Sequence, residues 1–326
     1  MRAAALLAAA GLVAMTFALC AGHDWASPAA VLRAVVGDDS LRGRLLTEWR
    51  MPRAFAAALV GGLLGLSGAI FQGVFRNPLA EPYLLGASGG AAIGATVALL
   101  VPLGLPSGPT LAALAFLGAW GATWLVLFAA AGGGRLDAAT LLLAGVAVAA
   151  ILGAVRSFLM LALSDDAVNL QVVLSWTLGG IQTPDWPGLG VLAVLTAGMI
   201  AVSAMLARGL DLLSLGEGEA RGVGLSPERF LGAAVLVGAA AVACAVAWGG
   251  LVAFVGLIAP HIARWTVGVR HARLLPASAA VGASLVLVCD GLARALLPPA
   301  EIPLGLVTAV AGGPFFLVLL RNRRRA

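Results

Sequence analysis

Long runs of apolar residues, separated by short polar connections, fill almost the whole chain. A helix needs about 20 mostly apolar residues to cross a bilayer. The pattern predicts an all-α, polytopic membrane protein whose residues 1–326 form one transmembrane domain. We predict ten membrane-crossing helices, at residues 3–21, 54–74, 86–105, 110–131, 138–163, 188–207, 230–249, 251–267, 275–297 and 302–320.

Two of these ten segments have a second interpretation. The first resembles a secretory signal peptide, because Arg2 precedes the apolar run Ala3–Leu19. That run is longer than the usual ~7–15 residues and no clean A-x-A cleavage site follows, so we expect a retained helix. The eighth segment is short and contains Arg264, with Gly249 and Gly250 as a break before it.

Composition narrows the choice of function. Hydrophobic residues make up 61% of the chain and charged residues 11%, against ~45–50% and ~25% in soluble domains. All 20 basic residues are arginine. A P-loop needs a lysine, so the chain lacks a standard ATP site, and Schiff-base chemistry is excluded as well. Cys20, Cys244 and Cys289 lie singly in apolar runs, which is typical of small buried side chains and indicates no metal site.

The arginines also predict an orientation, because cytoplasmic loops of membrane proteins are rich in arginine. The C-terminal group places the C-terminus in the cytoplasm, and ten crossings bring the N-terminus to the same side. That group is Arg321, Arg323, Arg324 and Arg325. The inside loops then hold Arg76, Arg135, Arg208, Arg221, Arg229, Arg264, Arg270 and Arg273. Residues 23–53 break the rule: this outside stretch is rich in arginine, so either the topology is wrong or the arginines have a function.

The predicted helices contain few ionisable residues. Asp290 and Arg294 are spaced i, i+4, so they can pair and lower the cost of burial. No series of acidic residues and histidines crosses the membrane, which disfavours a carrier coupled to an ion gradient. Residues 52–55 and 227–230 begin similar segments, five predicted helices apart. They predict an inverted repeat, as in many transporters.

Three polar segments are candidates for function. Residues 76–90 contain two prolines and Asn77, and suggest either a tight connection or a constriction on a transport path. Residues 208–229 form the longest inside loop, predicted as two short helices; they are either a solvated face or a docking surface for a soluble partner. In residues 254–264, Pro260 should kink a helix and free a backbone carbonyl.

Several ordered motifs carry a resemblance to a known family. They are residues 50–53, 77–90, 141–146, 215–217, 254–264, 271–276, 301–305 and 313–315. Together they resemble the transmembrane subunits of the ABC importers for vitamin B12, ferric siderophores and haem (the FecCD type). The resemblance implies a type II ABC importer permease fold with ten helices and both termini cytoplasmic. It also implies a homodimer in the bacterial inner (plasma) membrane, with a pore on the two-fold axis.

The resemblance implies partners as well. Two ATPase subunits would dock on the cytoplasmic face, and a soluble periplasmic or extracellular binding protein would dock outside. ATP and Mg²⁺ would be used by the ATPase, so we expect no cofactor on this chain. We expect no nucleic-acid partner either, because the arginines are spread among apolar segments.

The resemblance assigns roles to residues, none of them catalytic or metal-binding. The cytoplasmic gate would be formed by Asn77 and Leu79, with Ala138 and Ala139. Residues that couple to the ATPase would be Leu213, Leu215, Gly216, Glu217, Ala220, Arg221 and Gly224. Residues that dock the binding protein would be Arg50, Arg53 and Arg294.

We therefore expect the permease subunit of an ATP-driven importer for an iron chelate, either a ferric siderophore or haem. Vitamin B12 is the alternative substrate. A remote alternative is an intramembrane serine protease, because Ser88 lies in a G-x-S-G pattern (86–89) and His261 could act as its base.

Overall fold

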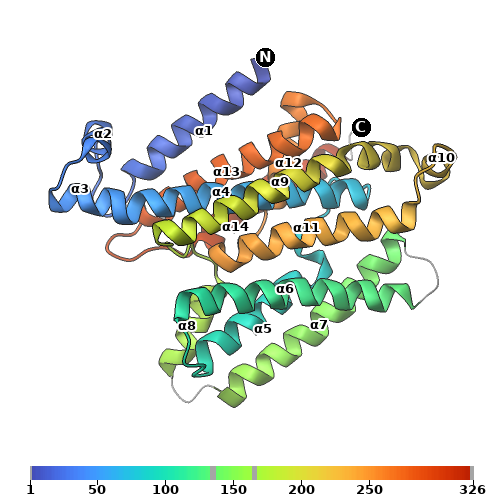
Figure 1. Ribbon diagram of the computed structural model, residues 1–326, viewed down its shortest axis with the longest axis horizontal. Coiled ribbons are helices and arrows are strands. Elements are labelled where there is room, and N and C mark those ends of the chain that lie inside the picture. Colours follow the sequence, from blue (N-terminus) through green and yellow to red (C-terminus); the bar gives the residue numbers. More distant parts are fainter. Residues whose placement is uncertain (1, 133–136, 164–166, 324–326) are drawn as a thin grey trace.

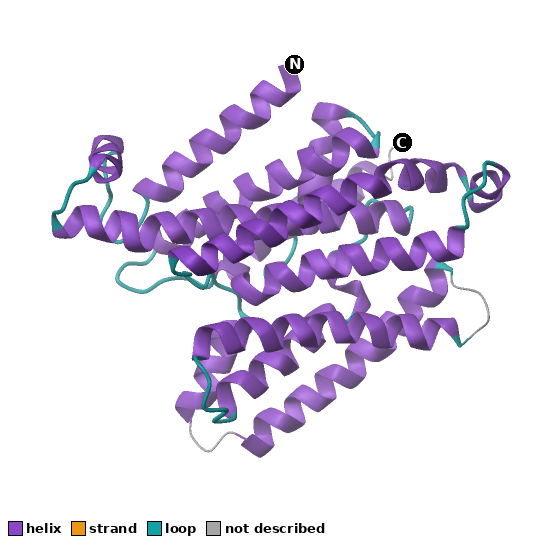
Figure 2. Cartoon of the chain, in the orientation of Figure 1, coloured by secondary structure: helices purple, strands orange, loops and turns teal. Residues whose placement is uncertain are grey.

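The computed structural model describes residues 2–132, 137–163 and 167–323. These residues form helices and connections without a β-strand, which confirms the predicted all-α fold (Figures 1 and 2). Arg135, Arg324 and Arg325 lie outside the described residues. The helices are α1 (Arg2–Cys20), α2 (Pro28–Val36), α3 (Leu41–Leu45), η1 (Leu46–Arg50), α4 (Met51–Val74), η2 (Pro82–Leu85), α5 (Ala87–Leu100), α6 (Ser107–Ala131), α7 (Ala138–Leu163), α8 (Ala167–Thr177), α9 (Trp186–Leu215), α10 (Glu217–Gly222), α11 (Pro227–Gly249), α12 (Val255–Val267), α13 (His271–Ala295) and α14 (Leu304–Arg323).

Each predicted crossing corresponds to one helix, but not all of these helices have the predicted length. In the described part of the chain, seven helical stretches are long and apolar enough to cross a membrane. The other three predicted crossings correspond to α5, α12 and α14. With 14 and 13 residues, α5 and α12 extend about 20 Å at 1.5 Å per residue. The hydrocarbon core is about 30 Å thick, so neither helix spans it alone. The apolar pattern therefore overestimated the length of both helices.

The short helices α5 and α12 begin after two irregular turns that contact each other. The Tyr83 hydroxyl accepts the Val252 N–H at 3.2 Å and donates to the Val252 carbonyl at 3.3 Å. The carboxylate of Glu81 accepts the Phe254 N–H at 3.0 Å. Irregular backbone is tolerated at membrane depth where protein satisfies its polar groups. The residues in these turns are therefore not helical, although the apolar pattern alone predicts that the helices extend through them.

Helix α4 is the most enclosed of the candidate spans, and α9, α11, α12 and α13 all pack against it. Glycines on α4 let two of these neighbours approach very closely. A Cβ atom on Gly61 would lie 2.3 Å from the Gly282 carbonyl oxygen, and one on Gly68 would lie 1.9 Å from that of Gly256. Small residues at such contacts are the usual basis of helix packing in membranes.

The two helices of the predicted inverted repeat lie side by side. Figure 1 shows α4 and α11 running in opposite directions, and each carries a proline in its first turn. The Ser67 hydroxyl joins them by donating to the Gly238 carbonyl at 2.9 Å. Opposite directions are what an inverted repeat predicts for these two helices.

Helices α5 to α8 form a second group beside the α4 bundle, and α6 connects it to α11 (Figure 1). Within this group α5 and α6 are in very close contact. A Cβ atom on Gly90 would lie 2.0 Å from the Gly118 oxygen, and the reverse distance is 2.1 Å. Helix α7 lies at the edge of this group and leaves most of its apolar surface uncovered.

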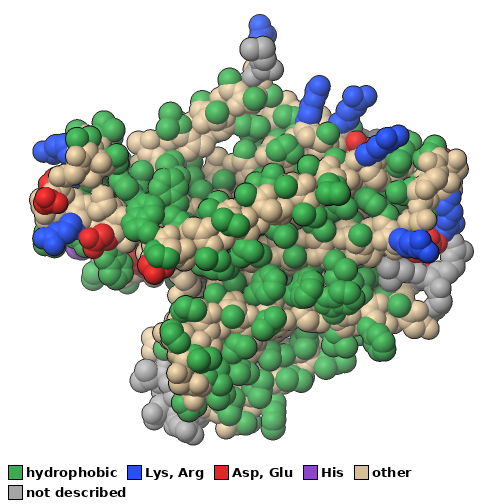
Figure 3. All heavy atoms as spheres, in the orientation of Figure 1, with side chains coloured by type: hydrophobic (Ala, Val, Ile, Leu, Met, Phe, Trp, Pro, Cys, Tyr) green, Lys and Arg blue, Asp and Glu red, His purple; other side chains and the backbone are tan. Residues whose placement is uncertain are grey.

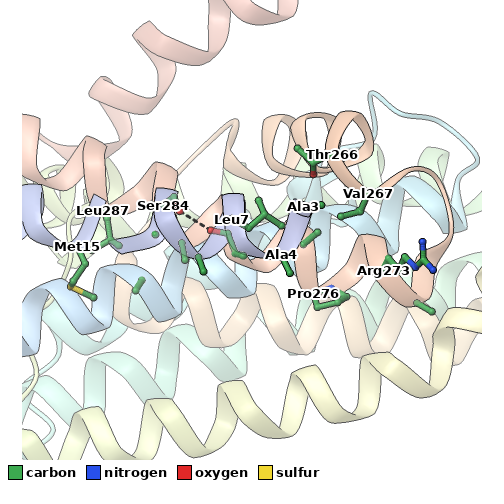
Figure 4. Close-up of a pocket in the computed structure, with 17 residues that line it drawn as sticks. Ala3, Ala4, Leu7, Met15, Thr266, Val267, Arg273, Pro276, Ser284 and Leu287 are labelled. Carbon is green, nitrogen blue, oxygen red and sulfur yellow. Dashed lines mark hydrogen bonds between the residues drawn. The ribbon is translucent and has the colours of Figure 1, made fainter. Parts of the chain in front are cut away.

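Helix α1 lies at the edge of the molecule and packs mainly against α13. A groove of about 950 Å³ runs between these helices (Figure 4). Its wall is apolar, with Ala4 and Leu7 from α1 and Ala280 from α13, and Arg273 stands at one end. Since this groove leaves much of α1 uncovered, specific contacts at the C-terminal turn of α1 are important for holding it.

Charged side chains gather toward the two ends of the bundle, and the flank between them is largely hydrophobic (Figure 3). We call these the α2 end, where α1 ends and α4 begins, and the α10 end, where α4 ends and α11 begins. This distribution is expected of helices that cross a membrane between two aqueous sides.

Candidate functional site

The predicted gate residue Asn77 lies directly after α4, at the α10 end. Its side-chain oxygen accepts the Leu79 N–H at 3.0 Å, which closes a tight Asx turn. Asn77 is exposed and Leu79 is half-buried. The two residues therefore form a compact turn at the start of the irregular segment between α4 and α5.

The second predicted part of the gate lies at the start of α7. Asp137 accepts the Thr140 N–H at 2.8 Å and caps this helix. Ala138 is half-buried and Ala139 is exposed. The contact between α7 and the irregular segment lies about two turns further on, where a Cβ atom on Gly145 would be 2.4 Å from the Leu84 carbonyl oxygen. A shared gate with Asn77 stays a prediction.

The predicted coupling segment is only partly a loop. Helix α9 continues as far as Leu215, so the first part of residues 208–229 is helical, and the six-residue α10 follows. Gly216 separates the two helices with φ at +128°, a conformation that favours glycine. Arg221 forms an ion pair with Glu228 at the start of α11. The segment therefore consists of two consecutive helices, and an ion pair connects the second of them to α11.

The coupling segment presents two different faces. Leu213 and Ala220 are buried and hold it against the bundle. Leu215 and Val223 are 69% and 64% exposed. Gly224, with φ at +88°, ends α10 by donating to the Arg221 carbonyl at 2.9 Å. Exposed leucine and valine beside charged residues make a surface suited to a soluble protein partner.

One groove brings the predicted gate and the predicted coupling segment together. It has a volume of about 750 Å³ and lies between the end of α4, the end of α9 and the start of α13. Asn77 and Leu215 both line it. An ion pair also joins the two regions, with Arg76 Nη2 3.6 Å from Glu217 Oε1. Neighbouring motifs pointed to each region, but nothing in the sequence predicted this ion pair.

A buried polar network explains the arginine in the predicted eighth crossing. Pro260 lacks an N–H and therefore frees the Gly256 carbonyl one turn before it. The Gln72 amide donates to this carbonyl at 3.4 Å and to the Leu257 carbonyl at 3.3 Å. Arg264 completes the network by donating to the Gln72 side-chain oxygen at 2.6 Å. The network therefore satisfies the backbone that the proline disrupts.

The three predicted docking arginines gather at the α2 end. Asp290 is fully buried and accepts from Arg53 at 3.0 Å and from Arg294 at 3.0 Å. The i, i+4 pair between Asp290 and Arg294 is confirmed. Arg53 also contacts Glu301 at 2.9 Å. We call these four side chains the arginine cluster; two guanidinium groups and two carboxylates balance its charge.

Arg294 and Arg50 also hold the C-terminal end of α1. Arg294 is only 6% exposed and donates to the carbonyls of Ala18 and Ala21, both at 2.7 Å. Arg50 donates to the Cys20 carbonyl at 3.3 Å and to the Asp24 carbonyl at 2.6 Å. The last carbonyls of a helix lack partners and carry negative partial charge, so two cations stabilise this end.

Two short helices that the sequence did not predict project at the α2 end. Ser27 caps α2 by accepting the Ala30 N–H at 3.2 Å, and Ser40 caps α3 by accepting the Gly43 N–H at 3.1 Å. Hydrogen bonds from Ser40 lower the pKa of the Asp38 carboxyl. The capping serines were the available signal for these helices, and the long apolar runs around them obscured it.

The residues of the protease alternative belong to different environments. Ser88 lies in the first turn of α5, directly after the irregular segment. His261 lies on α12 and packs edge-on against Trp265 and Phe315, with ring centroids 5.0 and 5.8 Å away. These contacts account for His261 as part of an aromatic cluster.

The fold defines a class of protein: a multi-pass membrane protein in which irregular turns precede two short helices. Residues 9–322 match the FecCD transport family, and the chain belongs to that family. The hemin transport system permease of Yersinia pestis is 40% identical, with 84% of this chain and 82% of the relative covered. The vitamin B12 import system permease of Klebsiella pneumoniae is 38% identical, covering 96% and 92%.

A solved structure extends this likeness to the fold. An inward-facing conformation of a metal-chelate type ABC transporter matches with a TM-score of 0.84 and 30% identity, over 98% of both chains. The chain is therefore a permease subunit of an ABC importer with the type II fold. Such a permease works with ATPase and substrate-binding partners.

Proposed function

We propose that this chain forms half of a homodimeric permease that imports an iron chelate, a ferric siderophore or haem, across the inner membrane. The observation that carries the proposal is the match, over 98% of both chains, to the metal-chelate type transporter. The hemin permease relative supports the same substrate class. Vitamin B12 is the second candidate, favoured by a relative that this chain matches over 96% of its length.

The exposed helices support the homodimer. On α7, Leu143, Phe158 and Leu161 are all exposed and apolar, and so are Val310 and Leu317 on α14. These helices are the predicted fifth and tenth crossings, which would line the path between the two copies. A second copy would cover part of this surface, and lipid would cover the rest.

The proposed orientation places both termini and the α10 end in the cytoplasm, and the α2 end outside. In this orientation Arg208, Arg221 and Arg229 belong to the cytoplasmic side, as the arginine rule requires. The ATPase would then dock on the exposed Leu215 and Val223 of the coupling segment. ATP and Mg²⁺ would be bound by that partner and not by this chain.

Substrate identity can be measured with the reconstituted complex. Proteoliposomes that contain the permease, its ATPase and its binding protein would be supplied separately with labelled haem, a ferric siderophore and vitamin B12. We expect uptake of an iron chelate to exceed uptake of vitamin B12. Uptake of vitamin B12 alone would replace the iron chelate with the second candidate.

Two of the predicted docking arginines, Arg50 and Arg53, offer a test of docking at the α2 end. We expect Arg50→Glu with Arg53→Glu to weaken binding-protein capture by about tenfold or more, because it would place negative charge opposite the acidic residues that we propose the binding protein presents to these arginines. Capture is measured by pull-down of the binding protein. Copurification of the ATPase serves as the check on folding, because Arg50 also holds α1 and Arg53 pairs with the buried Asp290.

A matched control uses two other arginines of the same end. Arg33 and Arg44 are exposed. The double variant Arg33→Glu with Arg44→Glu makes the same change in net charge. It should reduce capture less than Arg50→Glu with Arg53→Glu does. Equal loss in both double variants would show that net charge steers the partner and that Arg50 and Arg53 have no specific role.

A further inference from the structure

Arg76 occupies a backbone position that normally belongs to glycine. It follows the last residues of α4 with φ at +48°, in the left-handed region. Its N–H donates to the Gly73 carbonyl at 3.3 Å, and the Asn77 N–H donates to the Gln72 carbonyl at 3.1 Å. This pair of bonds is a Schellman motif, in which the left-handed residue is usually glycine. A side chain there is strained, because Cβ crowds the backbone.

The strained arginine stands out in this chain. The sequence contains 43 glycines, and eight described glycines take a positive φ. In the described ranges, Arg76 and Phe254 are the two non-glycine residues that do so. Both border the irregular turns that meet in the bundle. Strain kept at such a place indicates that the side chain is needed there.

The Arg76 side chain connects two regions with different proposed roles. Its guanidinium reaches Glu217 Oε1 at 3.6 Å, and Glu217 is the first residue of α10. Its backbone leads directly into Asn77, whose side chain closes the turn to Leu79. Both Arg76 and Asn77 line the groove beside Leu215. A displacement of α10 would therefore act on the residue next to the gate.

We propose that Arg76 is a positioning residue that couples movement of α10 to the gate turn at Asn77, through its ion pair with Glu217. The proposal rests on the proposed function, in which the ATPase docks on the coupling segment. The Schellman bonds fix the Arg76 backbone to α4. A displacement of Glu217 with α10 would therefore pull on the Arg76 side chain and shift the gate turn that follows it. Without the ion pair, ATP hydrolysis continues but moves less substrate.

Arg76→Gly separates coupling from folding. Glycine relieves the left-handed strain, so the variant should assemble with the ATPase and unfold at a temperature no lower than that of the parent. The amount of substrate moved per ATP hydrolysed should fall by about fivefold or more. Arg76→Lys keeps the charge and should retain most of the coupling. Arg273→Gln, an exposed arginine away from the ion pair, is the control and should leave the ratio unchanged.

The charge-swapped pair tests the contact itself. Arg76→Glu alone and Glu217→Arg alone should each lower the ratio of transport to ATP hydrolysis. Arg76→Glu combined with Glu217→Arg should recover part of it, as expected of a direct pair. An Arg76→Gly complex that transports at the parent ratio overturns the proposal, and so does one that no longer binds the ATPase. If the parent complex itself does not transport with ATP, the proposed function fails, which is a separate result.

Discussion

Asp290→Asn is expected to lower the free energy of unfolding by about 3–5 kcal/mol. Asp290 is fully buried and is the carboxylate that Arg53 and Arg294 share. Asparagine is nearly the same size but carries no charge, so Arg294 would lose its carboxylate partner in a buried site, and only the half-exposed Glu301 would remain to pair with Arg53. Arg294 would then be less well placed to hold the last carbonyls of α1. The loss is measured by denaturant unfolding of the protein in detergent micelles.

Glu301→Gln provides the matched control. Glu301 pairs with the same Arg53, but its side chain is 52% exposed. Exposed ion pairs contribute about 0–1 kcal/mol, so this variant should be close to the parent. If Asp290→Asn were as mild as Glu301→Gln, the arginine cluster would not be holding α1 and α13 together.

Gly68→Ala is expected to destabilise the bundle by about 3 kcal/mol, toward the upper end of overpacking costs. The added methyl group would lie 1.9 Å from the Gly256 carbonyl oxygen, which is backbone and has little freedom to move. Helices α4 and α12 would have to separate, and the Gln72 network beside them would be disturbed. Thermal unfolding and ATPase copurification would both report the change.

Gly62→Ala is the control on the same helix. Its nearest neighbour would be the Ala279 carbonyl oxygen at 3.6 Å, an ordinary contact. Alanine favours a helix over glycine by roughly 0.5–1 kcal/mol, so this variant should be unchanged or slightly more stable. Equal destabilisation by both variants would contradict the close approach of α4 and α12.

In the described part of the chain, the apolar pattern predicted the positions of the seven helical stretches that are long and apolar enough to cross a membrane, because each needs a long run of residues compatible with lipid. It failed to predict helix length where polar side chains of one segment bond to the backbone of another. Hydropathy gave no sign that α5 and α12 would be short, since the turns before them are stabilised by Tyr83 and Glu81 reaching the backbone of Val252 and Phe254. Such contacts depend on tertiary structure.

The candidate sites show the same division. The sequence singled out Asn77, Glu217 and the arginines of residues 23–53 from motifs and from charge in unexpected places. It did not show that Arg294 would be buried and bonded to α1, or that Arg76 would contact Glu217. It predicted the carbonyl freed by Pro260 but not Gln72, which satisfies it. Partners distant in sequence leave no local pattern.

We infer that a separate ATPase drives substrate through this chain. The most direct test is uptake of labelled iron chelate into proteoliposomes that contain the permease, its ATPase and its binding protein. We expect uptake with hydrolysable ATP, none with a non-hydrolysable analogue, and no response to an imposed proton or sodium gradient. Uptake by the permease alone, driven by such a gradient without ATP, would contradict it.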